Sequence, residues 1–184
     1  MKDKSFSLKP FSPASVPPNL KITGDMARRG DTLAIRYALR GRLAQIVIPA
    51  PAGVPARKNG LWEETCFEFF LAPRNSPGYW EFNLSPAGHW NVYGFENYRQ
   101  GRQEETAFTS LPLSVQRRAG SLLLALEVDL ARIVQTDQTL KVSVAAVIKL
   151  AGGGATYWAL THPGPEADFH RRDSFIVELA GCGD

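Results

Sequence analysis

The side chains best suited to binding or catalysis lie between residues 61 and 98, where acidic, amide and aromatic residues alternate with apolar ones. Glu68 is the most unusual of them. On a strand over residues 65–71, the alternation of faces would place Glu68 between Cys66 and Phe70. A lone carboxylate among apolar side chains costs several kcal/mol unless it is paired, exposed in a cleft or bound to a ligand. The sequence therefore points to Glu68 as a binding residue.

The next two apolar segments repeat this pattern. Strand alternation would place Glu81 and Asn83 on one face of the first segment, and Asn91 and Tyr93 on one face of the second. If the three segments are neighbouring strands, these side chains form one polar surface with aromatic residues around it. Sugar recognition needs this mixture, because pyranose C–H faces stack on aromatic rings while hydroxyls bond to carboxylates and amides.

We therefore expect a carbohydrate or a similar polyol as a small-molecule ligand. Trp62 and Trp90 would be its stacking surfaces, while Glu68, Asn83 and Tyr93 would form hydrogen bonds. One alternative is a sheet with a solvated face and no ligand.

Another alternative is a glycoside-processing enzyme. Glu68 and Glu81 could supply the paired carboxylates that glycosidases place about 5–10 Å apart. Asp168 could also orient His170 as a general base. However, the sequence contains no nucleophile elbow, phosphate loop or His-Glu-x-x-His motif, so we expect binding without catalysis.

A second group of aromatic and ionisable residues lies in a Pro- and Gly-rich segment near the C-terminus and includes Trp158, His162, Asp168 and His170. The last three could ligate a metal, since imidazole and carboxylate suit transition ions, although their spacing matches no metal motif. The alternative is an ordered surface loop in which Asp168 accepts hydrogen bonds from backbone N–H groups. All four residues are included in the candidate ligand site, and a metal ion is left open.

Ten apolar segments of strand length, rich in β-branched and aromatic residues, are separated by turn residues without intervening helical patterns. They cover residues 20–24, 32–39, 45–48, 65–71, 79–85, 90–95, 122–129, 140–149, 155–160 and 174–179. This organisation predicts an all-β fold, a two-sheet antiparallel β-sandwich of the immunoglobulin or jelly-roll kind. Four prolines predict an extended lead-in over residues 1–18, followed by a single domain over residues 19–180.

The overall composition excludes several classes of protein. A chain of 184 residues suits one domain. Its net charge of +3 comes from scattered basic residues without a run of five like charges, so we expect no nucleic-acid partner. No apolar stretch approaches the roughly 18 residues that cross a membrane, and the N-terminus has no signal-peptide pattern. We therefore expect a soluble, cytoplasmic protein, with Cys66 as a buried free thiol; its oligomeric state is not indicated.

Several stretches in combination resemble a bacterial family of DOMON-like proteins that is related to the family 9 carbohydrate-binding modules. They are Trp62-x-x-Thr65-Cys66-Phe67-Glu68, Glu81-Phe82-Asn83-x-Ser85-Pro86-x-Gly88, Tyr157-Trp158-Ala159-Leu160 and Asp168-Phe169-His170. The resemblance covers about residues 20–179. It implies a two-sheet β-sandwich with a ligand site on one face, for a sugar or a haem in better-known relatives, and it does not imply catalysis.

The sequence departs from both kinds of relative. Haem-binding DOMON domains use an axial Met with His or Lys, whereas this chain has only Met1 and Met26, and Met26 precedes an expected turn. Haem is therefore the weaker alternative. Family 9 modules hold a sugar between two Trp residues, and no pair among the four Trp residues here matches that clamp.

Overall fold

The computed structural model describes residues 3–181, which form thirteen short or medium strands and four 3₁₀ turns. The strands are β1 Lys4–Ser7, β2 Lys9–Pro10, β3 Lys21–Arg29, β4 Thr32–Arg40, β5 Cys66–Pro73, β6 Tyr79–Leu84, β7 Trp90–Phe95, β8 Gln103–Glu104, β9 Ser114–Arg118, β10 Ser121–Asp129, β11 Leu140–Lys149, β12 Ala155–Ala159 and β13 Val177–Leu179. The turns are η1 Pro13–Ser15, η2 Leu43–Gln45, η3 Leu61–Glu63 and η4 Arg172–Ser174. Within the described residues, no helix is long and apolar enough to cross a membrane.

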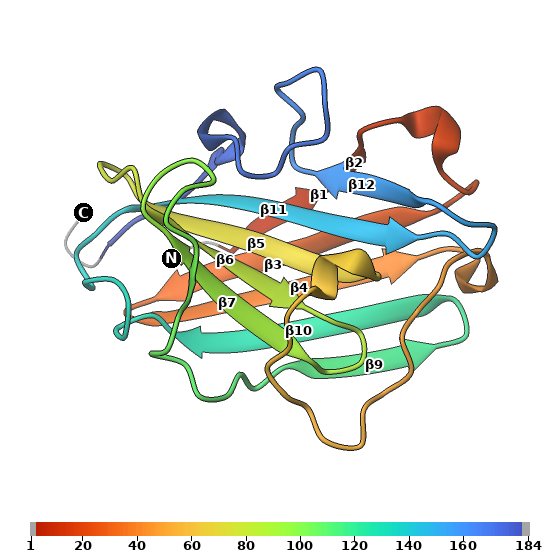
Figure 1. Ribbon diagram of the computed structural model, residues 1–184, viewed down its shortest axis with the longest axis horizontal. Coiled ribbons are helices and arrows are strands. Elements are labelled where there is room, and N and C mark those ends of the chain that lie inside the picture. The colour runs from red at the N-terminus through yellow and green to blue at the C-terminus, as the bar shows by residue number, and fades with distance from the viewer. Residues whose placement is uncertain (1–2, 182–184) are drawn as a thin grey trace.

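The strands form two antiparallel sheets that pack face to face (Figure 1). The smaller sheet has the order β1-β3-β4-β10-β9. The larger sheet has the order β2-β12-β11-β5-β6-β7-β8, and β13 also pairs with β11. This architecture confirms the predicted all-β sandwich.

Two segments differ from the sequence-based expectation. The extended lead-in over residues 1–18 contributes β1 to the smaller sheet and β2 to the larger one. Pro10 is tolerated in β2 because an edge strand can leave one N–H position unused. Residues 45–48 form no strand; η2 ends there, and Ile46 makes a single bridge to Leu150, because the prolines at positions 49 and 51 limit further pairing.

Side chains on the two faces of the larger sheet belong to two separate apolar clusters. Phe67, Phe69 and Phe82 face the smaller sheet and lie in the main core. Phe70 and Phe95 lie in a second cluster on the outer face of the larger sheet. β5 is therefore buried on both faces, which explains why its sequence is an apolar run interrupted only by one glutamate.

Contacts across the main core fix β5 relative to the smaller sheet. Tyr37 of β4 is buried, and its hydroxyl donates a 2.9 Å hydrogen bond to the backbone carbonyl of Glu68. Cys66 is a buried free thiol, as predicted. The hydrogen bond from Tyr37 fixes the backbone in the middle of β5, at the residue that carries the Glu68 carboxyl group.

Substitution of Gly24 by Ala should test the close packing between β1, β3 and β4. A Cβ atom at Gly24 would lie 2.0 Å from the carbonyl oxygen of Arg36 and 2.3 Å from the Phe6 ring. We expect Gly24→Ala to lower the free energy of unfolding by about 1–3 kcal/mol, the usual cost of overpacking, measured by urea unfolding. Gly120→Ala is the matched control, because a Cβ there meets nothing within 4 Å; equal effects of the two variants would contradict this packing.

Candidate functional site

Strand register brings the polar residues of β5, β6 and β7 together on the outer face of the larger sheet. Glu68 is opposite Asn83, which is opposite Asn91. In the neighbouring row, Glu81 is opposite Tyr93. The three segments are thus adjacent strands, and these five side chains share a face as strand alternation predicted.

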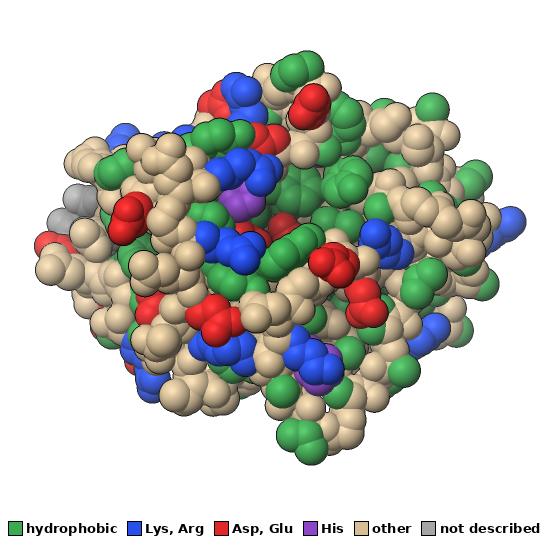
Figure 2. Space-filling model, in the orientation of Figure 1, with side chains coloured by type: hydrophobic (Ala, Val, Ile, Leu, Met, Phe, Trp, Pro, Cys, Tyr) green, Lys and Arg blue, Asp and Glu red, His purple; other side chains and the backbone are tan. Residues whose placement is uncertain are grey.

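A cleft of about 490 Å³ opens on this outer face. It is lined by apolar, acidic and basic side chains, which Figure 2 shows around a hollow in the surface. The lining residues are Trp62, Glu68, Glu81, Phe95, Arg99, Arg102, Val147, Tyr157, Ala167, Phe169 and His170. A volume of this size suits a small organic ligand.

Trp62 reaches the cleft from η3, which lies in the connection before β5. The turn begins after Gly60, whose φ of 72° is the left-handed conformation that glycine adopts without strain. The Trp62 ring packs edge-on against Tyr93, with 5.9 Å between ring centroids. The Arg102 guanidinium lies over both rings, 5.5 Å from the Trp62 centroid and 5.0 Å from that of Tyr93. The indole is half-buried, so part of it is open to a ligand.

The Glu68 carboxyl group is the most constrained polar group in the cleft. The residue is only 3% exposed, and its Oε1 atom has no hydrogen-bond partner among the described residues. Burial, and secondly the nearby charge of Glu81, raise the pKa of Glu68 well above its usual range. Glu68 is therefore protonated over a wider pH range than an exposed glutamate.

Glu81 is also buried, but it has neighbours that stabilise its charge. Its Oε1 atom accepts a 2.7 Å hydrogen bond from Asn83. Burial raises the pKa of Glu81, and the Asn83 hydrogen bond together with the charges of Arg102 and Arg99 partly offsets that effect. The two glutamates thus differ, because only Glu81 has cations close enough to favour its ionised form.

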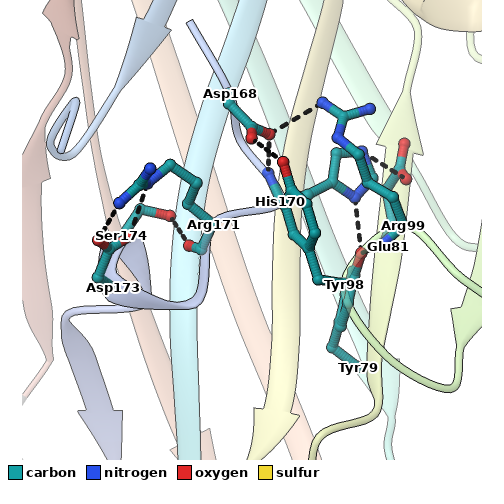
Figure 3. A network of polar contacts seen from close by, with 9 residues as sticks. All are labelled: Tyr79, Glu81, Tyr98, Arg99, Asp168, His170, Arg171, Asp173 and Ser174. Carbon is teal, nitrogen blue, oxygen red and sulfur yellow. Dashed lines mark hydrogen bonds and ion pairs between the residues drawn. The ribbon is translucent and has the colours of Figure 1, made fainter. Parts of the chain in front are cut away.

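His170 connects Glu81 to Tyr79 and enters the cleft from the loop between β12 and η4 (Figure 3). The Tyr79 hydroxyl accepts a hydrogen bond from the backbone N–H of Arg99 and lies 2.8 Å from His170 Nδ1. We assign Tyr79 as the donor to Nδ1, which places the imidazole proton on Nε2, 3.7 Å from Glu81 Oε2. Burial, and secondly the charge of Arg99, lower the pKa of His170 to about 4, so the ring is neutral near pH 7.

Asp168 joins two loops that are far apart in the sequence. Its carboxylate accepts a 2.5 Å hydrogen bond from the Tyr98 hydroxyl and forms a 2.9 Å ion pair with Arg99 (Figure 3). It also accepts a hydrogen bond from the backbone N–H of His170. Burial opposes ionisation of Asp168, but the hydrogen bonds from Tyr98 and Arg99 outweigh it and lower the pKa. The contact holds the His170 loop against the loop that follows β7.

The predicted site residues fall into three groups. Those that line the cleft are Trp62, Glu68, Glu81 and His170. Those that lie behind the lining and position it are Asn83, Tyr93 and Asp168. Those that lie elsewhere are Trp90, Trp158 and His162.

The placement of the third group corrects the expected roles of its members. Trp90 and Trp158 are each 3% exposed in the main core, so neither indole face is open to a ligand. Trp90 is covered further by the Arg57 guanidinium, 4.5 Å from its ring centroid. His162 lies against the N-terminal segment, with Nε2 2.8 Å from the Lys9 carbonyl oxygen. Stacking in the cleft is thus left to Trp62 and the other aromatic lining residues.

The geometry also bears on the metal and haem alternatives. In residues 3–181, no group of three or more His, Cys, Asp or Glu side chains is arranged to hold a metal ion. His162 interacts with the N-terminal segment, whereas Asp168 and His170 interact around the cleft. Met26 is 1% exposed in the main core between the sheets and does not line the cleft, so it does not fit the role of an axial haem ligand beside His170.

Sequence reasoning missed much of the cleft wall. Arg99 and Arg102 lie in a segment that reads only as a polar loop, and no local signal points them toward Glu81. Phe95 has the same strand parity as Tyr93 and could have been found by alternation. Tyr157 and Phe169 contact each other, with ring centroids 6.2 Å apart, but belong to a different part of the chain.

Comparisons with known proteins support the fold. No protein-family model matches the sequence, and no curated protein matches it significantly. A candidate carbohydrate-binding protein from Bacteroides uniformis superposes with a TM-score of 0.68 and 16% identity, over 96% of this chain and 85% of that one. A family 9 carbohydrate-binding module from Caldicellulosiruptor kristjanssonii, in complex with glucose, superposes with a TM-score of 0.52 and 9% identity, over 90% and 78%. The same module with cellotriose gives 0.53 and 9%, over 90% and 77%. At these identities the likeness establishes a common fold.

Glu68→Gln should change how stability depends on pH. The pKa of Glu68 is raised on folding, so its contribution to stability is fully present below its unfolded pKa of about 4.3 and is lost as pH rises through the folded value. We expect the stability of Glu68→Gln relative to the parent to increase from pH 5 to pH 8, measured by urea unfolding. Glu127→Gln, at an exposed position on β10, should show no such trend. A constant difference for Glu68→Gln would contradict the burial of an unpaired carboxyl.

Titration of His170 by NMR should give a midpoint near pH 4. Replacement of Arg99 by Gln should raise this pKa toward that of an exposed histidine, because it removes a nearby positive charge and frees Asp168 from its ion pair. Arg36→Gln, a change of the same charge on the smaller sheet, should leave the midpoint unchanged. A midpoint near 6.5 in the parent protein would show that the ring is not buried in this contact.

Proposed function

We propose that this chain is a non-catalytic carbohydrate-binding protein and that a small sugar occupies the cleft on the outer face of the larger sheet. The observation that carries the proposal is the Glu68 carboxyl group, which lines the cleft and has an oxygen without a hydrogen-bond partner in the part of the chain that the structure describes. A buried polar atom without a partner costs about 1–3 kcal/mol. A ligand that offers hydrogen bonds at this point would remove that cost.

The rest of the lining supports a sugar. The half-buried indole of Trp62 provides an apolar surface for a pyranose face. Glu81 and the Arg102 guanidinium provide acceptors and donors for hydroxyl groups around the ring. The fold it shares with a module crystallised with glucose and cellotriose agrees with this proposal and indicates which sugars to test first.

The same carboxyl groups favour binding over glycoside hydrolysis. A glycosidase needs one protonated and one ionised carboxyl group, so the pKa values of the pair must be pushed to opposite sides of the working pH. Burial raises the pKa of both Glu68 and Glu81, and although Arg102 and Arg99 favour the ionised form of Glu81, the net shift of its pKa is also upward. Within the described residues, no charged group bonds directly to either carboxyl group. Neither glutamate is therefore kept ionised in the way that a nucleophile or general base requires.

Calorimetric titration with glucose and cellotriose should detect binding at millimolar concentrations or below, which corresponds to at least about 4 kcal/mol. Trp62→Ala should weaken the affinity about tenfold, roughly 1.4 kcal/mol, because the stacking surface is lost. Binding should also change the tryptophan fluorescence of the protein.

Two matched variants separate this site from other tryptophans. Trp62→Phe should abolish the fluorescence change, whereas Trp80→Phe should retain it, because Trp80 is similarly half-buried but does not line the cleft. Aryl glycosides incubated with the protein should release no chromophore. The proposal fails if no sugar in a broad panel, including amino sugars, binds at millimolar concentration, or if Trp62→Ala leaves the affinity unchanged.

A further inference from the structure

We propose that the preferred ligand is an amino sugar whose ammonium group lies against the carboxyl group of Glu68. This inference rests on the carbohydrate-binding function proposed above and specifies the chemical class of the sugar. It follows from the uneven distribution of charge in the cleft, where two buried carboxyl groups are lining residues and the two lining arginines contact other groups than Glu68.

The cations of the cleft are already engaged away from Glu68. Arg99 forms its 2.9 Å ion pair with Asp168, and Arg102 lies over the rings of Trp62 and Tyr93. Both arginines favour the charged form of Glu81. Across residues 3–181, no Lys, Arg or His nitrogen lies within 4.0 Å of the Glu68 carboxylate. Among the described residues, Glu68 thus has neither a cation nearby nor a hydrogen-bond partner for its Oε1 atom.

The other titratable groups around Glu68 offer no positive charge. Burial first, and then the charge of Glu68, raise the pKa values of Tyr37 and Cys66, so both stay neutral. Glu81 adds a further negative group. His170 lines the same cleft but is neutral near pH 7. None of these groups therefore supplies a positive charge that could balance an ionised Glu68.

A buried carboxyl group without a counter-ion has two ways to avoid an isolated charge. It can keep its proton, which the raised pKa of Glu68 favours, or it can ionise beside a cation. A neutral sugar leaves the first state in place. A protonated amino sugar allows the second, with a charge-assisted hydrogen bond that is about twice as strong as one between neutral groups.

This difference predicts a proton balance for binding. The Glu68 carboxyl O–H bond breaks, its proton passes to the buffer, and the carboxylate accepts a hydrogen bond from the sugar ammonium, which keeps its own three protons. Binding of an amino sugar should thus release up to one proton per site. Binding of a neutral sugar of the same shape should release none.

Calorimetry with glucosamine, glucose and N-acetylglucosamine tests the inference on the unmodified protein. At pH 6 the glucosamine amine is protonated, whereas acetylation removes the charge and keeps the ring. We expect glucosamine to bind at least tenfold more tightly than the other two sugars. Its apparent enthalpy should differ between phosphate and imidazole buffers by an amount corresponding to proton release, and the enthalpies of the neutral sugars should not.

Glu68→Gln should remove both the preference for glucosamine over glucose and the proton release. Glu127→Gln carries the same change of charge at an exposed position on the other sheet and should behave like the parent. If Glu68→Gln does not fold, the three sugars and two buffers on the parent protein decide the question without it.

The outcomes separate this inference from the function on which it rests. Glucose or N-acetylglucosamine bound as tightly as glucosamine, or glucosamine bound without proton release, would overturn the amino-sugar assignment and leave carbohydrate binding intact. Absence of binding by all three sugars would overturn the amino-sugar assignment, and absence of binding by every sugar of the broad panel would overturn the carbohydrate-binding function as well.

Discussion

Burial of the Glu68 carboxyl group in an otherwise apolar strand is the constraint around which the outer face of the larger sheet is organised. β5 packs against the smaller sheet on one face and against a second apolar cluster on the other, so the carboxyl group is largely cut off from solvent. Desolvation of this group opposes its ionisation, and the charge of Glu81 in the neighbouring row of the sheet opposes it further. The asymmetry between the two glutamates results from local geometry, since Glu81 is close to two arginines and accepts a hydrogen bond from Asn83, whereas Glu68 Oε1 has no partner within residues 3–181.

The wall of the cleft depends on a different kind of interaction. Two loops about 70 residues apart in the sequence meet through Asp168, which binds Tyr98 and Arg99 and also the backbone of His170. The Asp168 side chain is mostly buried, but Tyr98 and Arg99 are exposed, so solvent weakens these bonds as it does other surface ion pairs. Burial is the main cause of the lowered pKa of His170, and the same contacts fix Arg99 close to the imidazole, where its charge lowers that pKa further. The electrostatic state of the cleft thus depends on how its loops are joined as well as on the sheet beneath them.

The sheet itself could be predicted from the sequence, and the loops could not. Alternation of side chains placed Glu68, Glu81 and Tyr93 on one face, because the two-residue period of a strand is fixed by backbone geometry. The same rule assigns Trp90 to the opposite face from Asn91, so its expected role as a stacking surface conflicted with its own strand parity. The positions of Arg99 and Arg102 have no such rule, since a loop has no period and its course is determined by tertiary contacts. The sequence-based prediction missed two strands, β1, which pairs with β3, and β2, which pairs with β12. The prolines of residues 1–18 argue against interior strands, whereas an edge strand tolerates Pro10.

The cost of dehydrating Glu68 is met when the protein folds, by apolar packing on both faces of β5. A ligand that reaches this carboxyl group therefore binds an acceptor that is already stripped of water and held by its strand, and the low local dielectric strengthens each bond that it makes. In the free protein the same environment favours the proton over the charge. A group of this kind discriminates between ligands by charge more than by shape, because a neutral partner gains one ordinary hydrogen bond whereas a cation also stabilises an ionised form that the protein alone disfavours. The carboxyl group that burdens the stability of the sheet is, for this reason, the one best placed to give the cleft chemical selectivity.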